Sequence, residues 1–193
     1  MIRKRRASGL TLTEILVVVG IILVLAAIAL PVYKSARGKA RESSCSQNLR
    51  QLYMAMQIYS DLHDGGTTSL PGIPLTLPRN GFALKKHLDL PNGLFQCQDR
   101  HPEFPVGAYV FLFSATPSEQ FPTAAFQQFA SQLQERTPLI VDMNHRNDDK
   151  AGMQTMNKHF SFAMLANGSL IKANRRGSPG SFSYWTQHFL ENP

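Results

Sequence analysis

Residues Ile15 to Val32 read ILVVVGIILVLAAIALPV, eighteen positions in a row without a charged or hydrogen-bonding side chain. This length is the threshold for a helix that spans a membrane, whereas a helix on a soluble core would need a polar face. Counted from Leu10, the segment has 23 residues. As a helix it reaches roughly 35 Å, enough to cross the hydrocarbon core with some tilt. We therefore expect a transmembrane helix over residues 10–32.

The positive charge of the chain is concentrated next to this helix. The 193 residues carry 20 Lys and Arg against 13 Asp and Glu, but residues 1–50 hold nine of the basic and only two of the acidic side chains. The remaining residues are neutral overall, so we do not expect nucleic acid as a partner. The basic cluster at residues 3–6 is of the kind that stays in the cytoplasm, which points the N-terminus inward.

Two other N-terminal segments fit part of this pattern. A cleaved secretory signal has a shorter apolar stretch, of 7–15 residues, before a small-x-small cleavage site, which Ala27-Ile28-Ala29 could imitate. A plain signal anchor could also carry an independent soluble domain. Glu14 is the anomaly of this segment, because a carboxylate at the start of an apolar span is costly and is a functional candidate by default. A simpler role for Glu14 is a capping box with Thr11 in the first helical turn.

Residues 4–9, KRRASG, followed by Leu10, Glu14 and the apolar run with Pro31, resemble the class III signal of type IV pilins and of type II secretion pseudopilins. The resemblance implies a leader of residues 1–9, cleaved after Gly9 by a prepilin peptidase that then methylates the amine of Leu10. The family usually has phenylalanine where this chain has Leu10. Glu14 would neutralise the amine of a neighbouring subunit in the membrane, so that two buried charges pair. Pro31 removes one helical hydrogen bond and so kinks or locally melts the helix.

The resemblance also implies a function, partners and a location. The chain would be a structural subunit that polymerises with copies of itself and other pilins into a type IV pilus or a type II secretion pseudopilus, on an inner-membrane assembly platform. It would be a single-pass protein of the bacterial inner membrane, with a cytoplasmic N-terminus and a periplasmic or extracellular head. Which machine it serves, for secretion, adhesion or DNA uptake, stays open. The alternative is a signal-anchored periplasmic binding protein or enzyme in which residues 62–193 act alone.

Beyond Pro31 the helical pattern continues over residues 33–61 but becomes amphipathic. Apolar side chains recur at steps of three and four and form one stripe, made of Cys45, Leu49, Leu52, Met56 and Tyr59. The opposite face carries Arg41, Asn48, Arg50 and Gln57. This half should therefore lie with its stripe on an apolar partner, for which a sheet in the head is the obvious candidate.

The head, residues 62–193, shows the signals of a small antiparallel sheet. We expect strands over residues 106–113, 139–142, 160–165 and 169–173, a loop over 67–81, a short helix over 82–90, and a helix or ordered loop over 123–134. Asn167-Gly168 is a strong hairpin signal between the last two strands. From Asn174 onward we expect an irregular tail that ends in an aromatic cluster, namely Phe182, Tyr184, Trp185 and Phe189. The fold class is α+β, with a long N-terminal helix on an antiparallel sheet.

The head also resembles pilin-like proteins with a disulfide-tethered loop and a C-terminal hairpin, in residues 45–52, 95–97, 139–145 and 167–168. The chain has two cysteines, Cys45 and Cys97, both on the outer side of the predicted membrane helix. An oxidising compartment favours a disulfide between them, and two buried free thiols are the alternative.

Catalytic and metal-binding frames are missing from the sequence. The six histidines have neither the HExxH nor the CxxC spacing of a zinc site, and no nucleophile elbow or phosphate-binding glycine loop occurs. The carboxylates and amide of Asp142, Asn144, Asp148 and Asp149 could hold calcium, but their spacing fits no standard loop and solvated turn residues are the preferred interpretation. We therefore expect no enzyme, no metal and no cofactor.

Overall fold

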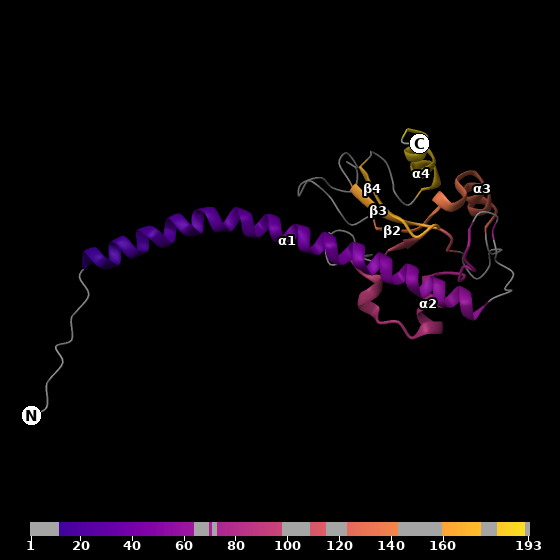
Figure 1. The fold of residues 1–193 in the computed structure, drawn as a ribbon, viewed down its shortest axis with the longest axis horizontal. Helices are drawn as coiled ribbons and strands as arrows, with labels where there is room; N and C mark the ends of the chain where they lie inside the picture. Colours follow the sequence, from indigo (N-terminus) through magenta and orange to yellow (C-terminus); the bar gives the residue numbers. More distant parts are fainter. Residues whose placement is uncertain are drawn as a thin grey trace, which may run out of the picture. The chain divides into compact units, whose positions relative to one another are not determined.

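The computed structural model describes residues 12–63, 70, 73–97, 109–114, 123–142, 160–174 and 181–191. The fold is α+β, with a long N-terminal helix and a four-stranded antiparallel sheet (Figure 1). The chain divides into two compact units, Met1–Ala40 and Arg41–Pro193, which are described separately below. The elements in chain order are α1 (Leu12–Leu62), α2 (Gly81–Leu88), η1 (Asn92–Phe95), β1 (Val110–Phe111), α3 (Ala124–Leu133), η2 (Gln134–Arg136), β2 (Pro138–Asp142), β3 (Phe160–Leu165), β4 (Leu170–Asn174) and α4 (Phe182–Glu191).

Helix α1 has 51 residues and ends within one residue of the predicted position. In the second unit its apolar stripe is buried as expected, with Cys45, Leu49, Leu52 and Met56 fully covered. Tyr53 extends this buried face and donates a hydrogen bond from its hydroxyl to the carbonyl of Ala166, at 2.9 Å. This burial confirms the prediction that the second half of α1 packs on the sheet through its apolar stripe.

The sheet has the order β1-β2-β3-β4, and all neighbouring strands are antiparallel. Strand β2 lies in the interior of the sheet, and all five of its residues are buried. Its predicted bounds and those of β3 and β4 are confirmed to within one residue. The apolar run of β2, Leu-Ile-Val, is typical of a strand that is covered on both faces.

The hairpin at Asn167-Gly168 is confirmed, and its geometry follows from the hydrogen bonds. Gly168 donates to the carbonyl of Leu165 at 3.0 Å, while Leu165 donates to the carbonyl of Ser169 at 2.9 Å. Gly168 has a φ of 82°, and no other described residue of this turn has a positive φ. This is the three-residue loop in which a turn is followed by a left-handed glycine.

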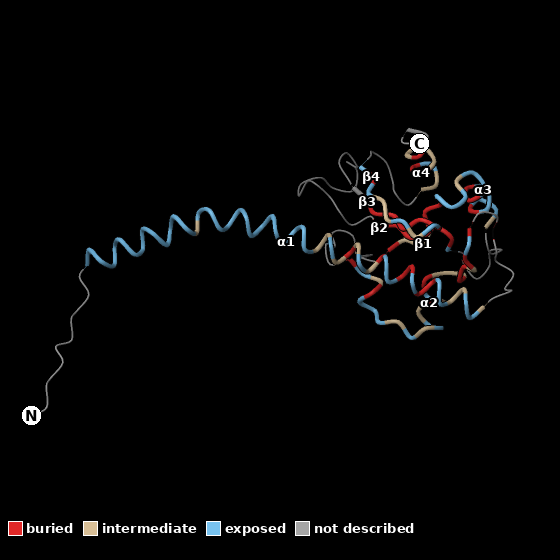
Figure 2. The backbone as a smooth tube through the Cα atoms, in the orientation of Figure 1, coloured by how far each residue is buried: buried red, intermediate tan, exposed pale blue. Residues whose placement is uncertain are grey.

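The core of the second unit is one cluster of buried side chains from the second half of α1, from the sheet and from helices α2, α3 and α4 (Figure 2). Trp185 of α4 is fully buried in it, together with Phe113 and Phe126. The rings of Phe129 in α3 and Phe182 in α4 stack at a centroid distance of 4.8 Å. Burial of apolar side chains, these aromatic ones among them, is the main contribution to the stability of the head.

Two sequence-based expectations about the head are wrong in extent or type. The strand predicted over residues 106–113 is formed only by Val110 and Phe111 within the described part, because the amide of Ser114 bonds the carbonyl of Phe111 and turns the chain. The prediction of an irregular tail is wrong over Phe182–Glu191, because these residues form helix α4. Phe182, Trp185 and Phe189 have helical spacing, and the hydroxyl of Ser181 accepts a hydrogen bond from the amide of Tyr184 at the start of the helix.

Replacement of Gly168 by alanine should destabilise the head by about 2 kcal/mol. A left-handed backbone costs a non-glycine residue roughly 1–2 kcal/mol. In addition, a Cβ atom at this position would lie 2.9 Å from Cε1 of Tyr53, whose ring is held by its bond to Ala166. Urea unfolding, followed by the fluorescence of the single tryptophan, Trp185, measures the loss.

The matched control is Gly93→Ala in η1. A Cβ there meets no atom within 4 Å, and the φ of Gly93 is not in the left-handed range. The change in the free energy of unfolding should therefore stay within about 0.5 kcal/mol. Equal effects of the two substitutions would contradict the role of the hairpin turn.

Candidate functional site

The first half of α1 presents an apolar surface that no described residue covers. Its large apolar side chains between Leu12 and Tyr33 are 48% to 81% exposed. Figure 2 shows the exposed colour along almost all of this half of the helix. Contiguous apolar surfaces of this extent mark a membrane or a partner molecule as the natural surroundings. Among the described residues, α1 is the helix that is long and apolar enough to cross a membrane, as an anchor or as a signal sequence.

Glu14 and Pro31 lie at opposite ends of this surface. Glu14 is an exposed acidic residue in the first turn of α1, where the positive end of the helix dipole favours a carboxylate. Pro31 lies inside α1, and the helix continues on both sides of it although proline supplies no amide hydrogen. Gly9 and Leu10, the predicted processing residues, and Thr11, the predicted capping partner of Glu14, lie outside the described residues.

In the second unit, a disulfide between Cys45 and Cys97 fastens α1 to residues 92–97. These residues, η1 and the two that follow it, are called the η1 segment below. This pairing was one of the two alternatives that the sequence left open. The Cα atoms are 5.1 Å apart, within the usual range for a disulfide, and both residues are buried. Asn48, one turn further along α1, adds hydrogen bonds from its side chain to the carbonyls of Gly93 and Gln96. The helix is therefore tied to this segment by one covalent bond and two polar contacts.

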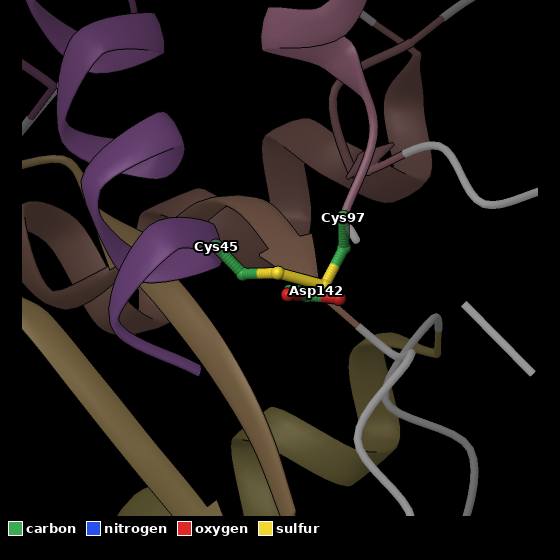
Figure 3. A group of neighbouring side chains, drawn as sticks. All are labelled: Cys45, Cys97 and Asp142. Carbon is green, nitrogen blue, oxygen red and sulfur yellow. A yellow bond between two sulfur atoms is a disulfide. The ribbon is translucent and has the colours of Figure 1, made fainter. Parts of the chain in front are cut away.

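A carboxylate stands beside the disulfide (Figure 3). Asp142, at the end of β2, is fully buried, and its oxygen lies within 4.8 Å of the sulfur atoms of Cys45 and Cys97. Because these sulfur atoms are bonded to each other, they offer no thiolate, and the three residues do not make a metal centre. The interpretation of Asp142 as a solvated turn residue is wrong. The rest of the proposed calcium loop, residues 143–149, lies outside the described part of the chain.

Tyr109 completes this buried polar cluster. Its hydroxyl donates to the carbonyl of Cys45 at 3.2 Å. Burial raises the pKa of the Tyr109 phenol, the nearby charge of Asp142 raises it further, and a hydrogen bond with Asn48 opposes the rise. The phenol therefore stays protonated and remains a hydrogen-bond donor to the helix that carries the disulfide.

Sequence reasoning found the two cysteines but missed the polar residues around them. Asn48 was placed on the solvent face of the amphipathic helix, but it is half-buried and bonds the η1 segment. Asp142 directly follows the apolar run of β2, and this position could have suggested an acid at a buried strand end. No spacing rule connects Tyr109 to Cys45, because the two residues are 64 positions apart in the sequence.

A long N-terminal apolar helix whose second half packs on a four-stranded antiparallel sheet is a pilin-like architecture. Comparison of the chain with protein-family models, with curated proteins and with solved structures found no match.

Proposed function

We propose that this protein is a prepilin-like structural subunit that is cleaved after Gly9, anchored by α1 and polymerised into a type IV pilus or a type II secretion pseudopilus. The observation that carries the proposal is that the two halves of α1 have different surroundings. Its second half packs on the sheet of its own chain, whereas its first half exposes apolar side chains all around the helix. Such a surface needs lipid before assembly, and copies of the same helix can replace the lipid afterwards.

The position of Glu14 supports assembly rather than simple anchoring. In a simple anchor, the helix dipole offsets only part of the cost of dehydrating a carboxylate at the start of the apolar span. Cleavage after Gly9 creates a positive amine on Leu10, four residues before Glu14. When helices stack with a stagger, the amine of one subunit meets the carboxylate of the next, and the two charges compensate each other in the membrane.

Mass spectrometry of the protein isolated from its native membrane tests the processing step. The mature chain should lack residues 1–9 and begin at Leu10, with or without one methyl group on its amine. Cleavage at this position places the new N-terminal amine one helical turn before Glu14, where it can supply the positive charge of the proposed pair.

Gly9→Val is the matched variant, since a branched side chain at the cleavage position should block removal of the leader while the apolar helix stays unchanged. The variant should accumulate in the membrane at full length. A wild-type chain that keeps Met1 in the native cell would favour a plain signal anchor and would refute the proposed processing. A wild-type chain cut after Ala29 instead would indicate a secretory signal.

A further inference from the structure

The C-terminal ends of α1 and α2 bring two histidines together. His63 directly follows α1, and His87 lies in the last turn of α2. Their ring centroids are 5.2 Å apart, and the ring planes are nearly perpendicular, at 88°. His63 also stacks on the ring of Tyr59 at 4.1 Å, which limits its rotation. Neither histidine has a role in the proposed function.

The hydrogen bond of His63 fixes which of its nitrogen atoms can bind a ligand. Nδ1 of His63 lies 2.8 Å from the backbone carbonyl of Tyr59. A carbonyl only accepts hydrogen bonds, so Nδ1 carries the proton, and the lone pair of the neutral ring is on Nε2. Histidines that bind metal ions usually donate their second nitrogen to a carbonyl or carboxylate in this way. The ring of His63 is therefore prepared as a metal ligand.

The spacing of the two rings suits a shared ion. Zinc–imidazole bonds of about 2.0–2.1 Å in a tetrahedral arrangement place two ring centroids roughly 5 Å apart. The observed 5.2 Å agrees with this separation. Imidazole is a ligand for zinc, copper and nickel rather than for calcium or magnesium, so the residues select a first-row transition ion.

The surroundings also favour a cation. The two rings lie at the C-terminal ends of α1 and α2, and the helix dipole places partial negative charge at each of these ends. Asp61 lies in the last turn of α1, which contains no basic residue. Lys85 and Lys86 in the last turn of α2 oppose the attraction, although Lys85 is engaged with the side-chain oxygen of Asn92.

We infer that His63 and His87 form a two-histidine site for a divalent first-row transition ion, with Zn²⁺ as the reference case. Among the described residues, no third histidine, cysteine or carboxylate groups with the pair, and water would fill the ligand positions that the protein leaves open. A bound ion would link the end of α1 to the end of α2 and so close the chain between them. The pair has no zinc-site spacing in the sequence, because the two histidines are 24 positions apart and lie at the ends of different helices.

The test is titration calorimetry with ZnCl₂ on the full-length protein in detergent micelles, prepared without a histidine tag. His63→Gln and His87→Gln should each weaken zinc binding by about tenfold or more, because each removes one of two ligands. The matched control is His188→Gln in α4, where the ring packs against Trp185 and Phe189. This control should bind zinc like the wild type.

A second readout separates ligation from a general loss of structure. One equivalent of Zn²⁺ should shift the side-chain NMR signals of His63 and His87 together, and should raise the thermal unfolding temperature of the wild type but not of His87→Gln. Unchanged affinity in both variants, with binding at other histidines, would overturn the inference. Equal weakening by His188→Gln would overturn it too.

Discussion

Glu14→Ala should abolish filament growth while the chain still inserts into the membrane and still loses residues 1–9. Removal of one partner from a buried ion pair costs about 3–5 kcal/mol, because the remaining amine of Leu10 is left without a counter-charge. At 1.4 kcal/mol per factor of ten, each subunit contact should weaken by at least about a hundredfold. The measurement is the amount of subunit in sheared, sedimented filaments relative to the amount in the membrane.

Two variants control this prediction. Glu14→Asp keeps the charge on a shorter side chain, so it should retain part of the assembly. Glu42→Ala removes a carboxylate from the same helix, but one that forms a partly exposed ion pair with Lys172 of β4 in the second unit. An exposed pair of this kind is worth at most about 1 kcal/mol, so filaments should form nearly normally. Normal filaments from Glu14→Ala would sink the pairing argument.

Removal of the disulfide should cost the head about 4 kcal/mol. The bond closes a loop across a sequence separation of 52 residues, and the chain-entropy model assigns this stabilisation to a loop of that size. The loss is a large part of the 5–15 kcal/mol that keeps a domain folded. Urea unfolding of Cys45→Ser/Cys97→Ser, followed by the fluorescence of Trp185, should show a midpoint lower by roughly 2 M at a slope of about 2 kcal/mol per molar.

The double variant is preferred to a single one, because a lone thiol beside the buried Asp142 would add its own effects. Reduced wild type serves as the matched control and should unfold at the same midpoint as the double variant. If the double variant and the oxidised wild type unfold together, the crosslink has no role in stability.

The sequence predicts well those parts of the fold that are decided by a local signal, such as a helical repeat of apolar residues or a turn dipeptide. The steps of three and four from Cys45 to Met56 define the buried face of α1, and Asn167-Gly168 defines the last hairpin. The predicted strand over 106–113 is too long because eight apolar or small residues in a row carry no information on where a strand ends. The turn from Phe111 to Ser114 ends it.

The surroundings of the disulfide could not be predicted in the same way, because they depend on contacts between distant segments. Asp142 ends β2 and Tyr109 directly precedes β1, and both lie beside α1 only through tertiary packing. A sequence window of one helix or one strand contains none of these neighbours. His63 and His87 could not be predicted as a pair for the same reason, since only the packing of α1 and α2 brings their rings together.

The two edge strands of the sheet, β1 and β4, determine how readily the sheets of two neighbouring heads could pair through their backbones. On one side, β1 has only two residues. On the other, β4 carries Lys172 near its middle, held by the carboxylate of Glu42. Short borders and charged borders both hinder the backbone of one sheet from zipping onto the next. In the proposed filament, where subunits would lie side by side at very high local concentration, these edges would keep the sheets of neighbouring heads separate and prevent amyloid-like fusion.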